Sequence, residues 1–180
     1  MTPTHQVKIG KLTRDLPIIQ LPSGIKIALF NSISDTEAVL EAAKELAKRM
    51  PQDIDVMVTP EAKSIPLTFA LAVETGLPYV VARKTCKPYM GDAVQADVNT
   101  ITTGGKQTLY LDEKDIHLLK NKNVVLVDDV VSTGSTVQNL QKLVEVAGGQ
   151  VAKIMAVFTE GDEEKWSDVI SLGHLPLEFD

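Results

Sequence analysis

The stretch from residue 124 to residue 136 restricts the fold of this chain more than any other part of the sequence. It begins with Val-Val-Leu-Val, continues with Asp128 and Asp129, and ends with Val-Val-Ser-Thr-Gly-Ser-Thr. An apolar run of this kind between polar ends is typical of a strand that is buried on both faces. A helix is expected to follow over about residues 135–146 and to end before Gly148. A buried strand that leads into a helix indicates an α/β protein.

The rest of the chain repeats this alternation of strands and helices. Strands are predicted at residues 24–31, 54–59, 78–82, 106–111, 123–128 and 150–158. Helices are predicted from a capping box at Ser34 and Glu37 to Pro51, and over residues 66–75 with Gly76 closing the last turn. Residues 83–103 have little periodicity and are predicted to form a long mobile loop. Because parallel neighbours need crossover connections, we expect a mostly parallel sheet flanked by helices, in one domain of 180 residues.

Composition excludes several other classes of protein. The chain carries 18 Lys and Arg against 24 Asp and Glu, and this net charge of −6 disfavours nonspecific attraction to nucleic acid or to an anionic membrane. No window approaches the roughly 20 consecutive apolar residues of a membrane span. The single cysteine, Cys86, has no internal disulfide partner, and residues 1–20 lack a signal-peptide core, so a cytoplasmic protein is expected. His5, His117 and His174 are too scattered to indicate a zinc site.

The acid pair and the hydroxyl-rich turn behind it predict a site for a sugar phosphate. Free amides at a helix N-terminus, with Ser and Thr hydroxyls beside them, bind a phosphate group, and Gly134 lets the backbone approach it. Asp128 and Asp129 would repel this phosphate unless a neutral or cationic group lay between, and a sugar with vicinal hydroxyls fits this position. In the simpler interpretation, one of the acids ends the strand and Ser132 or Thr133 merely caps the helix. The Lys of a nucleoside triphosphate loop and the motif Gly-x-Gly-x-x-Gly are both absent.

The same residues resemble the signature of the type I phosphoribosyltransferases. That signature is an apolar strand, two acids, two apolar or small residues and Ser/Ala-Thr-Gly-x-Thr, and every position is matched between Val124 and Thr136. The resemblance implies that family's fold, with 5-phosphoribosyl 1-pyrophosphate as substrate. It also implies that Asp128 and Asp129 hold the ribose hydroxyls. The 5-phosphate would then be bound by Val131, Ser132, Thr133, Gly134, Ser135 and Thr136.

A second segment, Thr59-Pro-Glu-Ala-Lys-Ser64, resembles the pyrophosphate loop of the purine branch of this family. The resemblance implies that Lys63 meets the pyrophosphate and that Ala62 and Ser64 offer backbone amides. Ser64 stands where the family usually has Gly, which leaves the backbone conformation of the loop open. Without the resemblance, the simpler interpretation of Glu61 and Lys63 is a pair of opposite charges exposed to solvent.

A third segment, with Arg83, Lys84 and Lys87, resembles the basic entry to the family's flexible loop. These cations would stabilise the charge that gathers on the leaving pyrophosphate, together with Mg²⁺. The ion is expected to be held mainly by the substrate, without a full cage of protein ligands. The resemblance thus implies catalytic roles for Asp128, Asp129, Arg83 and Lys87. Without the resemblance, Arg83, Lys84 and Lys87 would be interpreted as ordinary surface charges.

The identity of the base is less defined by the sequence. From Gly24 onward the chain resembles adenine phosphoribosyltransferases, but Thr103 and Gly104 stand where these usually carry a Glu-Tyr pair. Adenine is our first choice, and xanthine, hypoxanthine or guanine is the alternative. A sensor that binds the sugar pyrophosphate without catalysis is a third possibility. Glu160 could read a purine edge or be a solvated turn residue, and the two chain ends, with Trp166, are expected to form a hood over the base. A homodimer is expected from the resemblance alone.

Overall fold

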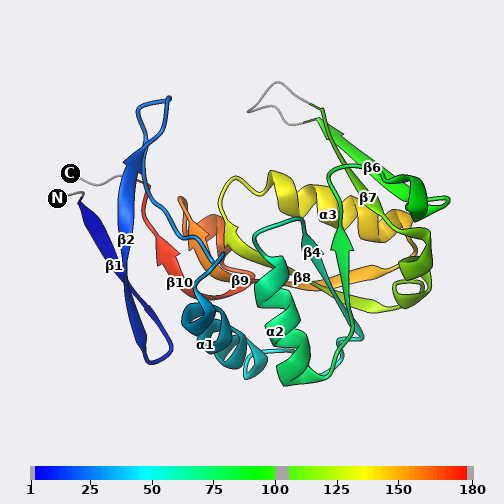
Figure 1. The fold of residues 1–180 in the computed structure, drawn as a ribbon, viewed down its shortest axis with the longest axis horizontal. Coiled ribbons are helices and arrows are strands. Elements are labelled where there is room, and N and C mark those ends of the chain that lie inside the picture. Colours follow the sequence, from blue (N-terminus) through cyan, green and yellow to red (C-terminus); the bar gives the residue numbers. More distant parts are fainter. Residues whose placement is uncertain (1–2, 100–105, 178–180) are drawn as a thin grey trace.

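The computed structural model of the protein describes residues 3–99 and 106–177. A parallel sheet of five strands forms its centre (Figure 1). In spatial order the strands are β10 (Val169–Leu175), β9 (Gln150–Glu160), β8 (Asn123–Val131), β4 (Val56–Pro60) and β5 (Tyr79–Ala82). All four neighbouring pairs of strands run parallel. The predicted α/β class and mostly parallel sheet are confirmed, although the sequence analysis did not predict β10.

Helices cover both faces of this sheet (Figure 1). One face carries α1 (Thr36–Ala47) and α2 (Ile65–Thr75), and the other carries α3 (Ser135–Val146). Successive side chains of a strand point to opposite faces, so Val125 of β8 packs with the core under α1 and α2, while Leu126 packs with the core under α3. Gly76 adopts a left-handed conformation and ends α2, as predicted.

Residues 94–99 form a strand, so the prediction of one long loop over residues 83–103 is wrong there. A 3₁₀ helix, η1 (Pro88–Met90), precedes this strand, β6 (Val94–Asn99), which pairs antiparallel with β7 (Lys106–Leu111). The two strands form a sheet separate from the central one. Ala96, Leu109 and Leu111 are buried in the core that also contains residues of α3. This packing stabilises a strand whose apolar alternation is too short to stand out in the sequence.

The N-terminal segment forms a small antiparallel sheet that the sequence analysis did not predict beyond β3. Its strands are β1 (Thr4–Ile9), β2 (Leu12–Gln20) and β3 (Lys26–Ala28), the last shorter than the predicted strand over residues 24–31. Ile9 and Leu16 belong to the core that contains α1 and Leu175 of β10. Figure 1 shows β1 beside β10 at one end of the molecule. A hood function for this region remains a prediction.

The N-terminus of α1 is capped differently from the predicted capping box. Ser34 has a φ of 71°, and the residue that caps the helix is Asp35, whose Oδ1 accepts a hydrogen bond from the backbone amide of Ala38 at 3.1 Å. Glu37 does not reach back to the cap; its Oε2 lies 2.9 Å from Nη2 of Arg14, whose Nε is 2.8 Å from Oδ2 of Asp35. The competing ion pairs with Arg14, which lies on β2, explain why the capping box does not form.

β8 is three residues longer than the predicted strand over residues 123–128, and this decides where the acid pair lies. Its pairing with β9 continues through Asp128, Val130 and Val131, opposite Ala156, Phe158 and Thr159. Asp128 and Asp129 therefore belong to a buried strand and are held by its backbone. The carboxyl ends of β4, β5 and β8 lie at the same edge of the sheet, where open α/β sheets bind ligands.

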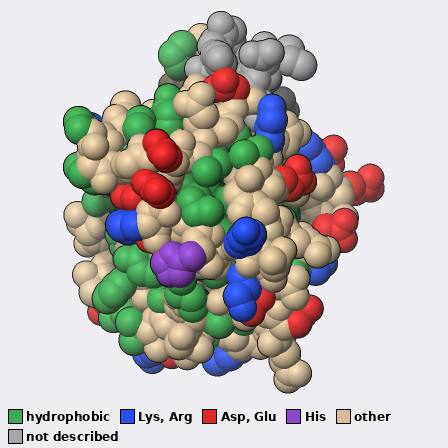
Figure 2. Space-filling model, turned by 90° about the vertical axis from the view of Figure 1, so that its right-hand side faces the viewer, with side chains coloured by type: hydrophobic (Ala, Val, Ile, Leu, Met, Phe, Trp, Pro, Cys, Tyr) green, Lys and Arg blue, Asp and Glu red, His purple; other side chains and the backbone are tan. Residues whose placement is uncertain are grey.

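The outer surface carries both signs of charge. Figure 2 shows the face at the right of Figure 1, where acidic and basic side chains are interspersed among hydrophobic ones. Of the helices in the described part of the chain, none combines the length and the apolar character that crossing a membrane requires.

Candidate active site

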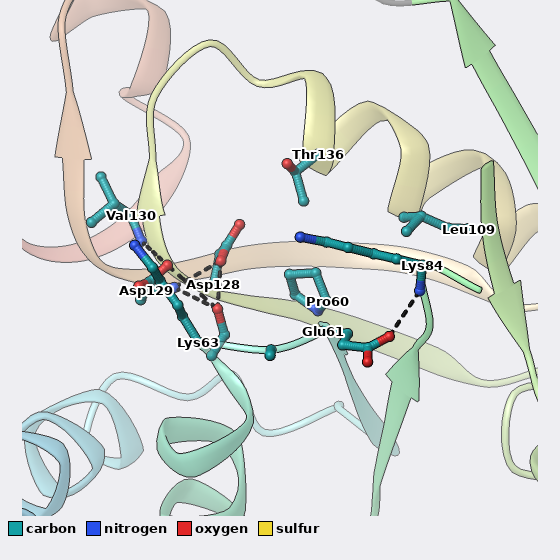
Figure 3. Close-up of a pocket in the computed structure, with 11 residues that line it drawn as sticks. Pro60, Glu61, Lys63, Lys84, Leu109, Asp128, Asp129, Val130 and Thr136 are labelled. Atoms are coloured by element: carbon teal, nitrogen blue, oxygen red, sulfur yellow. Dashed lines mark hydrogen bonds between the residues drawn. The ribbon is translucent and has the colours of Figure 1, made fainter. Parts of the chain in front are cut away.

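The loops at the carboxyl ends of β4, β5 and β8 surround one cavity of about 230 Å³ (Figure 3). It is lined by Pro60, Glu61, Ala62, Lys63, Ser64, Lys84, Leu109, Asp128, Asp129, Val130 and Thr136. The structure thus brings together residues from all three sequence segments in which site residues were predicted. Pro60, which belongs to the segment predicted as the pyrophosphate loop, and Leu109 also line the cavity, and no signal in the sequence pointed to Leu109.

The acid pair forms the polar floor of the cavity. Asp128 and Asp129 are each only 8% exposed, and Ser64 is 1% exposed. The hydroxyl of Ser64 donates a hydrogen bond to Oδ1 of Asp128 at 2.6 Å, and the backbone amide of Asp129 donates to the same oxygen at 2.9 Å. Figure 3 shows the other oxygen of Asp128 directed into the open space below Thr136. One carboxylate oxygen is therefore held by the protein and the other faces the cavity.

Burial changes the acidity of Asp128. Loss of solvation raises the pKa of the Asp128 carboxyl from 3.8 to about 7; the hydrogen bond from Ser64 opposes the rise, and the adjacent negative charge of Asp129 adds to it. Perturbed carboxyl groups that face a cavity are typical of functional sites. A ligand with hydroxyl donors or a cation would favour the ionised form of Asp128.

The hydroxyl-rich turn after β8 encloses a second, smaller cavity of about 80 Å³. It is lined by Asp128, Val130, Val131, Ser132, Thr133, Gly134, Thr136 and Val137. Asp128, Val130 and Thr136 line both cavities, so the turn and the acid pair adjoin each other. The N-terminus of α3 begins at Ser135, directly behind Gly134. Hydroxyl groups beside a helix N-terminus suit the binding of a phosphate, as the sequence predicts.

A short 3₁₀ helix, η3 (Glu164–Trp166), supports this turn from the outside. The Lys165 ammonium donates a hydrogen bond to the carbonyl oxygen of Thr133 at 3.0 Å, and the ring of Trp166 lies against Gly134. The Trp166 indole N–H donates to the carbonyl oxygen of Glu160 at 3.1 Å. The sequence predicts that Trp166 packs in the hood, and it indicates no role for Lys165, because nothing in the sequence links either residue to the turn.

Gly134 is the residue of the turn that tolerates a side chain least. Its φ is 85°, and a Cβ atom there would lie 2.5 Å from the Trp166 ring. We expect Gly134→Ala to lower the free energy of unfolding by about 2 kcal/mol or more, from the left-handed backbone and from the clash together. Denaturation with urea measures this loss.

Gly24→Ala is the matched control for this change, because Gly24 has a φ of 90° and no atom within 4 Å of the added Cβ. It is expected to show only the backbone part of the cost, about 1 kcal/mol. Equal losses in the two variants would contradict the proposed contact between Gly134 and Trp166.

Two lysine side chains approach the acid pair from opposite sides. Figure 3 shows the amino group of Lys84 in the space between Asp128 and Thr136, while Lys63 extends along Asp129 and Val130. Among the residues that the structure describes, neither ammonium group forms an ion pair. Both are therefore available to an anionic ligand, and they concentrate positive potential on this edge of an acidic protein.

Glu61 fixes the basic segment that follows β5. Its Oε2 accepts a hydrogen bond from the backbone amide of Lys84 at 2.9 Å and lies 3.1 Å from Nε of Arg83. These contacts hold the pKa of Glu61 below its ordinary value. Arg83 also donates to the Tyr89 hydroxyl, and its side chain does not line the cavity. Lys87 lies farther along, at the start of η1, and does not line it either.

Glu160 lies at the carboxyl end of β9 and is 7% exposed. Its neighbour Thr159 has its Oγ1 2.9 Å from Nδ1 of His174, whose Nε2 is 3.0 Å from the carbonyl oxygen of Gly161. The solvated turn that the sequence analysis left open for Glu160 is thus excluded by its burial. It lines neither of the two cavities described above. Thr103 and Gly104, where the Glu-Tyr pair of the adenine enzymes is missing, lie outside the described residues.

Adenine phosphoribosyltransferases are among the solved structures with similar folds. That of Thermoanaerobacter pseudethanolicus superposes with a TM-score of 0.66 at 22% identity, covering 96% of this chain and 95% of that one. That of Rhodothermus marinus gives 0.64 at 22% identity, covering 96% and 94%. At this level of identity the likeness bears on the fold.

Curated relatives are more similar in sequence over a shorter length. The hypoxanthine/guanine phosphoribosyltransferase of Methanococcus voltae is 34% identical over 136 residues, which are 76% of this chain and 67% of that protein. That of Ferroglobus placidus is 34% identical over 128 residues, or 71% and 65%. This chain thus spans about two thirds of the length of these relatives.

The family described as phosphoribosyl transferase domain matches residues 30–171, a range that contains the acid pair, the hydroxyl-rich turn and both lysines of the cavity. This match confirms the resemblance seen in the residues between Val124 and Thr136. The chain belongs to the phosphoribosyl transferase domain family, in the purine branch of its type I enzymes.

Proposed function

We propose that this protein is a Mg²⁺-dependent purine phosphoribosyltransferase, with adenine as its first-choice base. It would transfer the 5-phosphoribosyl group from 5-phosphoribosyl 1-pyrophosphate, here called the sugar pyrophosphate, to a purine nitrogen. Pyrophosphate and a purine nucleoside 5-monophosphate would be released. The observation that carries this proposal is one cavity in which a buried acid pair, two lysines and Thr136, the last residue of the hydroxyl-rich turn, meet.

Each part of the cavity suits one part of this substrate. Asp128 and Asp129 accept hydrogen bonds from the ribose hydroxyls, and the turn over residues 131–136 binds the 5-phosphate through amides and hydroxyls. Lys63 and Lys84, with the amides of Ala62 and Ser64, take the pyrophosphate. Arg83 and Lys87 lie outside the cavity and would act on the leaving group only after a movement of the segment that carries them.

The reaction that fits these parts is a displacement at ribose C1 with inversion. The bond to pyrophosphate breaks ahead of bond formation to the purine nitrogen, so positive charge develops on the ribose. With the substrate bound as proposed, the acid pair would lie beside the position where this charge develops, and the lysines would lie where the leaving group gathers negative charge. Positioning of the two reactants and charge stabilisation would supply most of the rate.

The donor set of the cavity suits a Mg²⁺ ion held mainly by the substrate. Within residues 3–99 and 106–177, no cluster of three His, Cys, Asp or Glu side chains could form a cage. The outward oxygen of Asp128 is a hard ligand of the kind that Mg²⁺ prefers. When bound, the ion would neutralise pyrophosphate charge.

The resemblance of the chain from Gly24 onward to the adenine enzymes supports adenine. Glu160 lines neither cavity, so it would accept a hydrogen bond from the adenine amine only after a movement that brings it to the base. The names of the sequence relatives favour the second candidate, a hypoxanthine or guanine phosphoribosyltransferase. Thr103 and Gly104 stand where the adenine enzymes have a Glu-Tyr pair, and the lack of this pair is the reason for a third candidate function, a non-catalytic sensor of the sugar pyrophosphate.

A panel of purines separates these candidates. The full-length protein is incubated with the sugar pyrophosphate, Mg²⁺ and, in separate reactions, adenine, hypoxanthine, guanine or xanthine, and pyrophosphate release is measured. We expect the highest kcat/KM with adenine, by at least tenfold, because each buried unmatched polar group costs about 1–3 kcal/mol. Faster turnover of an oxopurine would select the second candidate. Binding of the sugar pyrophosphate without turnover of any base would select the sensor.

We also expect a homodimer, as the family resemblance implies, and a cytoplasmic location, because a single cysteine suits a reducing compartment. Light scattering on the purified protein measures the oligomeric state.

A further inference from the structure

The hydroxyl of Ser64 does not form the helix-capping hydrogen bond that is expected at its position. Ser64 occupies the N-cap position of α2, where a serine hydroxyl usually accepts a hydrogen bond from an amide of the first turn. Here its φ of −81° and ψ of −8° are helical, and its side chain makes no capping bond. The hydroxyl instead leaves the helix and reaches an acid 64 positions away in the sequence.

Ser64 is enclosed in a dense set of hydrogen bonds. Its Oγ donates to Oδ1 of Asp128 at 2.6 Å and accepts from the amide of Asp129 at 3.0 Å. Its carbonyl oxygen accepts from the Thr68 hydroxyl at 2.8 Å. With both ends of the residue held and 1% of its surface exposed, the hydroxyl has little freedom to turn elsewhere.

These hydrogen bonds fix the orientation of the Asp128 carboxyl group. A carboxyl group rotates about its bond to Cβ unless its oxygens are held, and Oδ1 of Asp128 has two donors, the Ser64 hydroxyl and the Asp129 amide. The second oxygen is thereby aimed into the cavity (Figure 3). Among the side chains of the described residues, that of Ser64 alone links the loop over residues 61–64 to this carboxyl group.

We propose that Ser64 is a positioning residue that fixes the Asp128 carboxylate for the ribose hydroxyls of the substrate. The inference rests on the proposed function, since it takes the ribose as the ligand of Asp128. It adds a role for a side chain, where the resemblance implied only a backbone amide. Removal of the Ser64 hydroxyl leaves Asp128 with one donor and free to turn away, so the affinity for the ribose part falls while the affinity for pyrophosphate alone is retained.

Calorimetry with three probes tests this: the sugar pyrophosphate with Mg²⁺, ribose 5-phosphate, and pyrophosphate with Mg²⁺. Ser64→Ala is expected to weaken the two ribose-containing probes about tenfold, the effect of one lost hydrogen bond to a charged group, and to change pyrophosphate affinity by less than twofold. Ser64→Gly is a second variant that also lacks the hydroxyl. In an Asp128→Ala background the same change should have no further effect, because no side-chain oxygen is left at position 128 for Ser64 to hold.

Ser32→Ala is the matched control. Ser32 is equally buried and its hydroxyl holds the same loop, donating to the carbonyl oxygen of Lys63 at 2.8 Å, but it forms no hydrogen bond with the acid pair. Any effect of Ser32→Ala should fall on pyrophosphate and the sugar pyrophosphate alike. Thermal unfolding confirms that each variant is folded.

The outcomes separate the two proposals. If the wild-type protein does not bind the sugar pyrophosphate, the proposed function fails and the role of Ser64 fails with it. If the wild-type protein binds but Ser64→Ala has unchanged affinity for all probes, or loses pyrophosphate and ribose 5-phosphate equally, only the positioning role is overturned.

Discussion

Replacing Asp128 and Asp129 together by asparagine is expected to weaken binding of the sugar pyrophosphate at least a hundredfold. Each carboxylate loses its charge but keeps its shape and one acceptor oxygen, so the change removes charge-assisted hydrogen bonds to the ribose, each worth about 1.5–3 kcal/mol. Both side chains are buried, which keeps these interactions from being screened by solvent. Calorimetry with Mg²⁺ present measures the affinity, and pyrophosphate release measures the loss of turnover.

A control with the same change in net charge distinguishes the site from a general electrostatic effect. Asp53 and Asp168 are exposed, and neither lines the cavity. Asp53→Asn combined with Asp168→Asn should leave affinity within about twofold, as expected for screened surface charges. If the two double variants bind equally well, the ribose assignment is wrong.

Asp128→Asn alone is expected to make the folded protein more stable above pH 7. The pKa of Asp128 is raised to about 7 in the folded protein, against 3.8 as its ordinary value. Between these values the folded state holds a proton that the unfolded state has lost, so the wild-type stability falls as pH rises from about 4 to about 7. At about 1.4 kcal/mol for each unit between the two pKa values, the loss amounts to about 4 kcal/mol.

Asparagine cannot ionise and therefore escapes this loss, while its side-chain oxygen still accepts from Ser64 and from the Asp129 amide. Urea unfolding of both proteins at pH 5, 6, 7 and 8 measures the difference. The variant should be more stable by about 2 kcal/mol at pH 5, and the difference should grow to about 4 kcal/mol at pH 8. Parallel curves would show that Asp128 titrates in the folded protein as it does in the unfolded one.

The expected loss of affinity and the expected gain of stability have one cause. The ionised, buried carboxylate of Asp128 lowers the stability of the empty protein, and its interactions become favourable only when a ligand is bound. The sugar hydroxyls and Mg²⁺ would supply the donors and the positive charge that the cavity lacks. Strained and destabilising arrangements of this kind are common at functional sites. Saturation with the sugar pyrophosphate should accordingly raise the unfolding midpoint of the wild-type protein more than that of Asp128→Asn.

Local patterns in the sequence were sufficient for much of the fold. The apolar run over residues 124–127 predicted a buried strand, and Gly76 predicted the end of α2, because each effect depends on neighbours within a few residues. The acid pair and the hydroxyl-rich turn were predicted in the same way, since they follow one another along the chain. Elements that form only through distant partners were missed or shortened: β1, β2, β6 and β10, and the last three residues of β8.

For the candidate site, too, some properties follow from the sequence and others only from the tertiary structure. The sequence by itself determined which chemical groups the protein offers: two carboxylates, a hydroxyl-rich turn, and lysines at positions 63 and 84. Only the tertiary structure decided which of them meet, with Lys84 inside the cavity and Arg83 held outside it by Glu61. It also decided that the Ser64 hydroxyl serves Asp128 and not its own helix. The reason is physical: burial, pKa and hydrogen-bond partners depend on residues that are close in space, and their separation along the chain gives no sign of that closeness.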